Sequence, residues 1–314
     1  MLAYAKFVRE NYTYIILTTL VIAVVVGLFT SSPGAFIKHF NTPLIIVLIA
    51  AMSFTITFHD LAAAATNWKG SLFGVGLNFI LAPLLCWTLA SLFLQNHAEL
   101  AAGFILIGVV PCAGMAMMWT GLLKGNVPLS IVIEALTMLL APFVIPPLMS
   151  LLAGKFVAVN IWSMFQQLVY TVLLPVLGAI GLRELLQKRM DIQRYLPLMP
   201  AISASMAVLL MFMAINTSIL PITKNLGALG PLVAAAVLFF PVLFTIAYVA
   251  SFRLFPRGTS IALTYSSGMK NLPLAIGIAA MSLKGLASLP VAVAFAFQML
   301  TAVTFYQLFR RTMP

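Results

Sequence analysis

Charged residues are scarce in this chain, where they make up 7% of 314 residues, and only six of them are acidic. Soluble proteins carry about a quarter of their residues as charged side chains. Hydrophobic residues account for 63% of the sequence. This composition leaves no stretch for a soluble catalytic domain and predicts an integral membrane protein.

Cysteine is also rare, and the usual catalytic motifs are missing. The two cysteines, Cys86 and Cys112, both lie inside apolar segments, so no disulfide framework is expected. We find no Walker-type phosphate loop, no His/Cys cluster with zinc spacing and no nucleophile elbow. We therefore expect no enzyme activity, no ATP-driven transport, no cofactor and no metal site.

Long apolar runs, in contrast, fill almost the whole chain. A membrane-spanning helix needs about 20 apolar residues, and ten runs approach or exceed that length. They cover residues 13–30, 41–58, 71–94, 99–123, 127–153, 162–182, 197–219, 228–252, 258–283 and 288–309. We predict an all-α membrane protein with ten transmembrane helices. The first run has a basic start like a signal peptide, but it lacks a clear cleavage site and is expected to be a retained span.

The net charge of +11 is distributed unevenly between the predicted loops. With ten spans, both termini and the even-to-odd loops share one side of the membrane. Twelve basic residues fall on that side and four on the other, so we expect both termini to lie in the cytoplasm. The expected location is the cell (inner) membrane. Because the positive charge follows the predicted topology, we expect no nucleic-acid binding. The twelve are Lys6, Arg9, Lys69, Lys124, Arg183, Lys188, Arg189, Arg194, Arg253, Arg257, Arg310 and Arg311; the four are Lys38, Lys155, Lys224 and Lys284.

A polar interruption divides the ninth apolar run. Gly268, Asn271 and Pro273 all disfavour a continuous helix, and Lys270 places a cation between them. A charge in the hydrocarbon region is costly unless it has a partner. Broken helices with a polar centre near mid-membrane form the binding sites of many secondary transporters.

A second interruption, with Pro111 and Gly114, divides the fourth run. Pro111 and Gly268 are 157 residues apart, which is half of the 314 residues. The pattern predicts two five-helix repeats, 1–157 and 158–314, with broken helices 4 and 9 that cross. Because five is an odd number, the second repeat must be inverted relative to the first.

Few polar side chains lie inside the predicted spans. Glu134 is the only carboxylate and Lys270 the only cation there, so each is the natural partner of the other. Their pair would either take part in coupling or only hold helices 5 and 9 together. The buried amides of Asn78 and Gln298 either bond a neighbouring helix or line a site. His59 and Asp60 mark a membrane edge, as a functional pair or as an interfacial cap.

The interruption in the ninth run resembles a motif of the bile acid:sodium symporter superfamily, which has ten spans in two inverted halves. Those symporters read Glu-x-Gly-Met-Gln-Asn where this chain reads Ser-Ser-Gly-Met-Lys-Asn, residues 266–271. Gly268, Met269 and Asn271 match the motif. The resemblance implies that Ser266 replaces a sodium-binding Glu and that Lys270 replaces the Gln.

Other sodium-site positions of the family are altered as well. The resemblance places Asn78 at a sodium-binding Gln, Ala116-Met117 at a Ser-Asn pair, and Glu134 at a Thr, while Ser130 is retained. Sodium prefers several oxygen ligands, and a nearby ammonium repels it. The resemblance therefore implies that the Lys270 ammonium takes the place of a bound cation.

A second resemblance, to the arsenite permeases of the same superfamily, concerns the fourth run. Those proteins carry Cys-x-x-Met followed by Trp, which Cys112, Met115 and Trp119 match. Their Glu in the ninth span has no counterpart in Pro273-Leu274-Ala275. Buried membrane cysteines are also common as plain small residues.

The sequence therefore predicts a secondary transporter that moves a small anionic organic solute by alternating access, either proton-linked or uncoupled. The alternatives are an arsenite exporter that uses Cys112 and a membrane sensor that does not transport. The expected partners are the solute, a proton in the coupled case, and the lipid bilayer. The expected site residues are Glu134, Lys270, Asn271, Ser266, Ser267, Asn78, Ser130, Cys112 and Gln298, with the helix breaks at Pro111, Gly114, Gly268 and Pro273.

Overall fold

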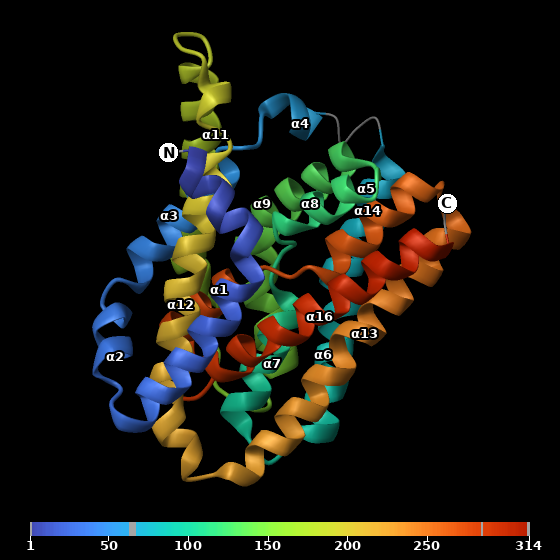
Figure 1. Ribbon diagram of the computed structural model, residues 1–314. Coiled ribbons are helices and arrows are strands. Elements are labelled where there is room, and N and C mark those ends of the chain that lie inside the picture. The colour runs from blue at the N-terminus through green and yellow to red at the C-terminus, as the bar shows by residue number, and fades with distance from the viewer. Residues whose placement is uncertain (1, 63–66, 284, 313–314) are drawn as a thin grey trace.

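A computed structural model describes residues 2–62, 67–283 and 285–312, and helices account for nearly all of the regular structure there (Figure 1). The α-helices are α1 (Leu2–Phe29), α2 (Ser32–Lys38), α3 (Asn41–Ser53), α4 (Phe58–Ala62), α5 (Trp68–Gly76), α6 (Ala82–Phe93), α7 (Ala98–Val109), α8 (Met115–Leu122), α9 (Val127–Ala153), α10 (Ile161–Leu168), α11 (Leu174–Leu186), α12 (Leu198–Thr223), α13 (Leu229–Leu254), α14 (Arg257–Gly268), α15 (Leu272–Ser282) and α16 (Ser288–Thr312). Short π-helical turns, η2 (Leu77–Leu81) and η3 (Val169–Leu173), join α5 to α6 and α10 to α11. The 3-10 turns η4 (Ile192–Arg194) and η5 (Leu226–Ala228) precede α12 and α13.

Seven continuous helical stretches in the described residues are long and apolar enough to cross a membrane, and the bent pair α2–α3 would be an eighth. The protein is therefore a multi-pass membrane protein. The fourth and ninth predicted spans are each divided into two helices, α7 with α8 and α14 with α15. None of these four helices is long enough by itself to cross a membrane. The arrangement of ten spans in two inverted repeats therefore stays a prediction.

The second predicted span is shorter than expected. It was expected to cover 41–58, but α3 ends at Ser53. The chain then turns, and the Asp60 carboxylate accepts hydrogen bonds from the backbone and hydroxyl of Thr57, with Thr57 N 2.8 Å from Oδ2. Asp60 N donates in return to Thr57 Oγ1 over 3.0 Å, so the two residues form a capping box at the start of α4. The prediction that His59 and Asp60 mark a membrane edge stays a prediction.

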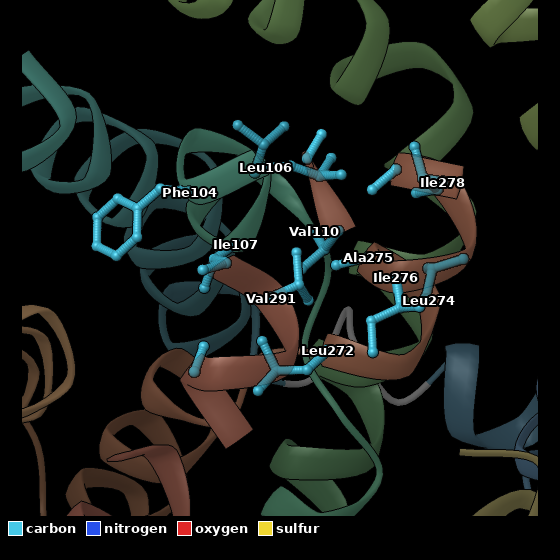
Figure 2. Close-up of a cluster of buried hydrophobic side chains, with 14 of the residues drawn as sticks. Phe104, Leu106, Ile107, Val110, Leu272, Leu274, Ala275, Ile276, Ile278 and Val291 are labelled. Atoms are coloured by element: carbon cyan, nitrogen blue, oxygen red, sulfur yellow. The ribbon is translucent and has the colours of Figure 1, made fainter. Parts of the chain in front are cut away.

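The long helices pack in two groups that meet at the broken helices. Helix α1 runs alongside α12 (Figure 1), and Asn216 of α12 fixes the turn after α1, since it accepts from Gly34 N and donates to Thr30 O. Figure 2 shows the apolar packing of the other group, in which Val110, directly after α7, lies close to Ala275 of α15 and Val291 of α16. Burial of these side chains holds the broken helices against their neighbours.

Proline residues explain both π-helical turns. Each turn lies directly before a helix with proline in its first two positions, Pro83 in α6 and Pro175 in α11. Proline has no N–H for the carbonyl one turn earlier, and a π-bulge accommodates that loss. Asn78 lies inside η2, so the bulge determines where this amide points.

Candidate functional site

The two helix breaks meet as a short antiparallel bridge between Cys112 and Lys270. Ala113 N donates to Met269 O over 2.8 Å, and Asn271 N donates to Pro111 O over 2.9 Å. The extended segments of the two breaks therefore satisfy each other's backbone groups, which must be paired inside a membrane protein. The predicted breaks and their crossing are both present.

Two helices begin at this crossing. Helix α8 starts at Met115 after Gly114, and α15 starts at Leu272 after Asn271, whose Oδ1 accepts from Leu274 N over 3.2 Å. The N-terminal end of a helix carries partial positive charge. The crossing therefore gathers two positive helix ends at one place.

Lys270 is completely buried beside this crossing. Its ammonium donates to Asn78 Oδ1 over 3.0 Å and to the Asn78 backbone carbonyl over 3.3 Å. Asn78 Nδ2 in turn donates to the carbonyls of Gly74 and Ser266, each over 3.0 Å. Lys270 N donates to Gln298 Oε1 over 2.9 Å. The amides of Asn78 and Gln298 thus hold Lys270 from two neighbouring helices.

Glu134 faces the start of α8 and not the ammonium of Lys270. The side chain is 3% exposed, and a Cβ added at Gly114 would lie 2.9 Å from Glu134 Oε1. Across the described residues, no hydrogen bond or ion pair engages the Glu134 carboxylate. The expected ion pair with Lys270 is therefore not formed in this conformation, because the Lys270 stem extends toward η2 whereas Glu134 extends toward Gly114.

Cys112 and Ser266 are also buried at the crossing. Cys112 N donates to Thr137 Oγ1 over 3.2 Å, and its thiol lies 3.5 Å from Ala113 O as a weak donor. The Ser266 hydroxyl is buried without a hydrogen-bond partner. This hydroxyl lies close to the Cys112 thiol.

Two predicted site residues have local roles instead. Ser267 donates to Leu263 O of its own helix over 2.7 Å, and Ser130 bonds Thr120, with 2.9 Å between the two hydroxyl oxygens. Neither hydroxyl is directed to the crossing by a contact in the structure. Gly268 permits close packing, since a Cβ there would lie 2.1 Å from the Phe244 ring, and Pro273 lies in the first turn of α15.

Met52 of α3 reaches the crossing although the sequence did not indicate it. Its Cε lies 3.1 Å from the position of a Cβ at Gly114, and Asn271 Nδ2 lies 3.9 Å from its Sδ. A methionine in an apolar helix carries no polar signal. Met52 of α3 therefore lies beside Gly114 and beside Asn271 at the start of α15.

A cavity of about 300 Å³ lies at one end of the bundle. Its walls come from α2 and α12 on one side and from α15 and α16 on the other. The lining residues are Lys38, Met213, Thr217, Ala279, Ala280, Leu283, Gly285 and Ser288. The cavity lies at the far end of α15 from the crossing.

Comparison with known proteins identifies the family. The model of the "Sodium Bile acid symporter family" matches residues 42–224, which is more than half of the chain. An uncharacterized sodium-dependent transporter of Bacillus subtilis, YocS, is 27% identical over 169 residues, which cover 54% of this chain and 52% of YocS. The probable chloroplastic sodium/metabolite cotransporter BASS1 of rice is 35% identical over 159 residues, 50% of this chain and 38% of that protein.

An arsenical-resistance protein, Acr3 of Alkaliphilus metalliredigens, is 24% identical over 163 residues, 48% of this chain and 46% of Acr3. The chain thus spans about half or less of the length of the curated relatives it matches. The match to the family model covers α3 to α12, including the first helix break and Glu134. The chain belongs to the sodium bile acid symporter family.

Proposed function

We propose that this protein is a secondary transporter which moves a small anionic organic solute across the membrane and does not use sodium as the coupling ion. The observation that carries the proposal is the buried crossing, where two helices begin beside the ammonium of Lys270. Two relatives are named as a sodium-dependent transporter and as a probable sodium/metabolite cotransporter, which supports transport as the activity.

The charge at the crossing favours an anion. Two helix N-termini contribute partial positive charge, and Lys270 adds a formal positive charge. Among the described residues, its ammonium donates hydrogen bonds only to the two neutral oxygens of Asn78. Asn271 Nδ2, which lies 3.9 Å from the weak acceptor Met52 Sδ, is available to donate to a carboxylate. A small organic carboxylate fits this set of donors.

The same ammonium opposes sodium binding. Lys270 already occupies the carbonyl and side-chain oxygens of Asn78, which are groups of the kind that ligate sodium. A second cation close to it would be repelled, and the repulsion is large where water is excluded. We infer that Lys270 acts as a resident cation and that the solute moves without sodium.

Glu134 is the residue we propose for proton coupling. Its carboxylate lies against the start of α8, at one of the two positive helix ends proposed to attract the solute. Protonation of Glu134 would free that helix end for an anion, and return of the proton would favour release. If Glu134 does not change its protonation state, transport would be uncoupled.

We further propose the ten-span topology with two inverted repeats, 1–157 and 158–314, and both termini in the cytoplasm of the cell membrane. The support comes from the two helix breaks half a chain apart and from the charge bias of the loops. Alternating access would then move the group with α1, α3 and α12 against the group with α7, α9 and α16.

The proposal is tested by uptake into liposomes that contain the purified protein. Saturable uptake of a labelled monocarboxylate, inhibited by other small organic anions but not by neutral analogues, is the expected result. Absence of saturable flux for every anion in a broad screen would contradict transport and favour a membrane sensor.

An arsenite exporter is the second candidate, because Cys112 is buried at the crossing itself. The similarity to Acr3 adds support. A host without its own arsenite exporter would become resistant when it expresses this chain, and Cys112→Ser would abolish the resistance. No change in resistance would exclude this candidate.

A further inference from the structure

A guanidinium group is buried without a counter-ion at the end of the bundle where α11 leads into α12. Arg183 of α11 is 8% exposed. One of its terminal nitrogens, Nη1, donates to the Thr55 carbonyl, while its Nε has no hydrogen-bond partner. Within the described ranges no carboxylate forms an ion pair with it. Burial of an unpaired charge is costly, so this position favours an anion.

The groups around Arg183 compensate only part of its buried positive charge. Thr55 follows the C-terminal end of α3, where a cation is favourable, but this contact uses one of the five N–H donors of the side chain. Two acids of this region, Glu184 and Asp60, accept hydrogen bonds from neutral donors. Glu184 accepts from Phe58 N over 3.4 Å and from Gln187, and Asp60 accepts from Thr57.

An apolar groove of about 250 Å³ lies at the same end of the bundle, and two of its lining residues are close in the sequence to Arg183 and to Thr55. Phe54 of the groove precedes Thr55, and Leu186 of the groove shares a face of α11 with Arg183 because it lies three residues further on. In Figure 1 the connection from α11 to α12 projects beyond the neighbouring helices. The groove is lined by Phe54, Leu186, Met190, Ile192, Tyr195 and Met199.

Three exposed basic residues lie close in the sequence to the residues that line the groove. Lys188, Arg189 and Arg194 belong to the connection that also supplies Met190 and Ile192 to the groove. Basic clusters beside a membrane helix attract anionic headgroups. A buried guanidinium, an apolar groove and a basic rim together match a molecule with an apolar chain and an anionic head.

We propose that this groove and Arg183 form a binding site for one anionic phospholipid. An acyl chain lies in the apolar groove, and the phosphate accepts hydrogen bonds from Arg183, with the exposed basic residues around the headgroup. A free phosphate would leave the groove walls uncovered, and a zwitterionic lipid would add a positive choline or ethanolamine group to an already basic rim. The site lies in the leaflet on the side of the α11–α12 connection.

The test uses the full-length protein in detergent, with phosphatidylglycerol and phosphatidylcholine of identical acyl chains as probes. Native mass spectrometry counts bound lipid, and thermal unfolding reports its effect on stability. We expect phosphatidylglycerol to bind about tenfold more tightly than phosphatidylcholine, because both carry the phosphate but only phosphatidylcholine adds a cation that the guanidinium and the basic rim repel. Arg183→Gln removes part of this positive charge, so it should weaken binding of phosphatidylglycerol more than binding of phosphatidylcholine and reduce the selectivity.

Two further variants make the result specific. Leu186→Trp keeps the guanidinium but fills the groove, so it should lower binding of both lipids even if Arg183→Gln folds poorly. Arg253→Gln removes an exposed positive charge from the last turn of α13 and should leave the selectivity unchanged. Equal affinity for the two lipids in the unaltered protein, or an equal loss in Arg253→Gln and Arg183→Gln, would overturn the proposal. Neither measurement depends on transport.

Discussion

The ammonium of Lys270 donates to both oxygens of Asn78, the side-chain carbonyl at 3.0 Å and the backbone carbonyl at 3.3 Å. Both residues are completely buried, and they belong to separate halves of the chain. A fully buried cation is stable only where oxygen atoms replace its hydration. This contact is therefore the main reason that Lys270 can remain at the crossing.

We first predict that Asn78→Leu destabilises the protein strongly. The substitution removes the side-chain acceptor of a buried ammonium, and a lost hydrogen bond to a charged group costs about 1.5–3 kcal/mol. In the background of Lys270→Met, the same substitution should cost much less, because no charge is then left unpaired. Chemical unfolding of the four proteins in detergent measures this coupling. Equal costs in the two backgrounds would mean that the contact does not stabilise Lys270.

The second prediction compares the effects of two asparagine substitutions on stability and on solute affinity. Asn126 and Asn271 each accept a hydrogen bond from the backbone N–H three residues later, over 3.1 and 3.2 Å, at the starts of α9 and α15. Substitution of either by Ala should cost about 1 kcal/mol of stability. Only Asn271→Ala should also lower solute affinity, because only Asn271 lies at the crossing. Equal uptake kinetics in the two variants would exclude Asn271 from the solute site.

A third prediction concerns the close packing of the ninth-span break. A Cβ at Gly268 would lie 2.1–2.5 Å from three ring atoms of Phe244, so Gly268→Ala should displace the α14 end and abolish uptake. Phe244→Leu should restore part of the uptake in the double variant. Gly178→Ala serves as the control, since nothing lies within 4 Å of a Cβ there. Full uptake by Gly268→Ala alone would place the solute site elsewhere.

The fourth prediction tests the proposed topology through the cavity beside α12. Thr217 lines this cavity, so Thr217→Cys should react with a membrane-impermeant maleimide added to intact cells. Lys188→Cys, in the α11–α12 connection, should react only after the cells are opened. The native Cys86 and Cys112 are buried and are expected to give little background. Labelling of Lys188→Cys in intact cells would reverse the proposed orientation.

The sequence was sufficient to locate the two breaks, because proline and glycine occur there together. Proline alone does not break a helix in this protein, since Pro142, Pro221 and Pro241 lie inside α9, α12 and α13. The sequence also predicted that the breaks meet, and the bridge between Cys112 and Lys270 confirms this. That prediction was based on the separation of Pro111 and Gly268 by 157 residues, half of the chain. The family resemblance is likewise confirmed by the matching family model.

The partner of Lys270 was not predictable in the same way. Charge counting paired Lys270 with Glu134, whereas the ammonium bonds a neutral amide that the π-helical turn η2 directs toward it. Side-chain direction depends on local helix geometry, and the periodicity of a sequence does not specify it. For the same reason Met52 was missed, since an apolar residue in an apolar helix gives no signal of its place at the crossing.

The central claim is that Lys270 replaces sodium, and one measurement tests it most directly. Uptake of the transported anion into liposomes is compared under a sodium gradient alone and a proton gradient alone, for the unaltered protein, Lys270→Gln and Glu134→Gln. We predict that the sodium gradient drives no accumulation by the unaltered protein, that a proton gradient drives accumulation, and that Glu134→Gln abolishes the effect of the proton gradient. Lys270→Gln should bind the anion more weakly. Accumulation driven by sodium in the unaltered protein would contradict the account.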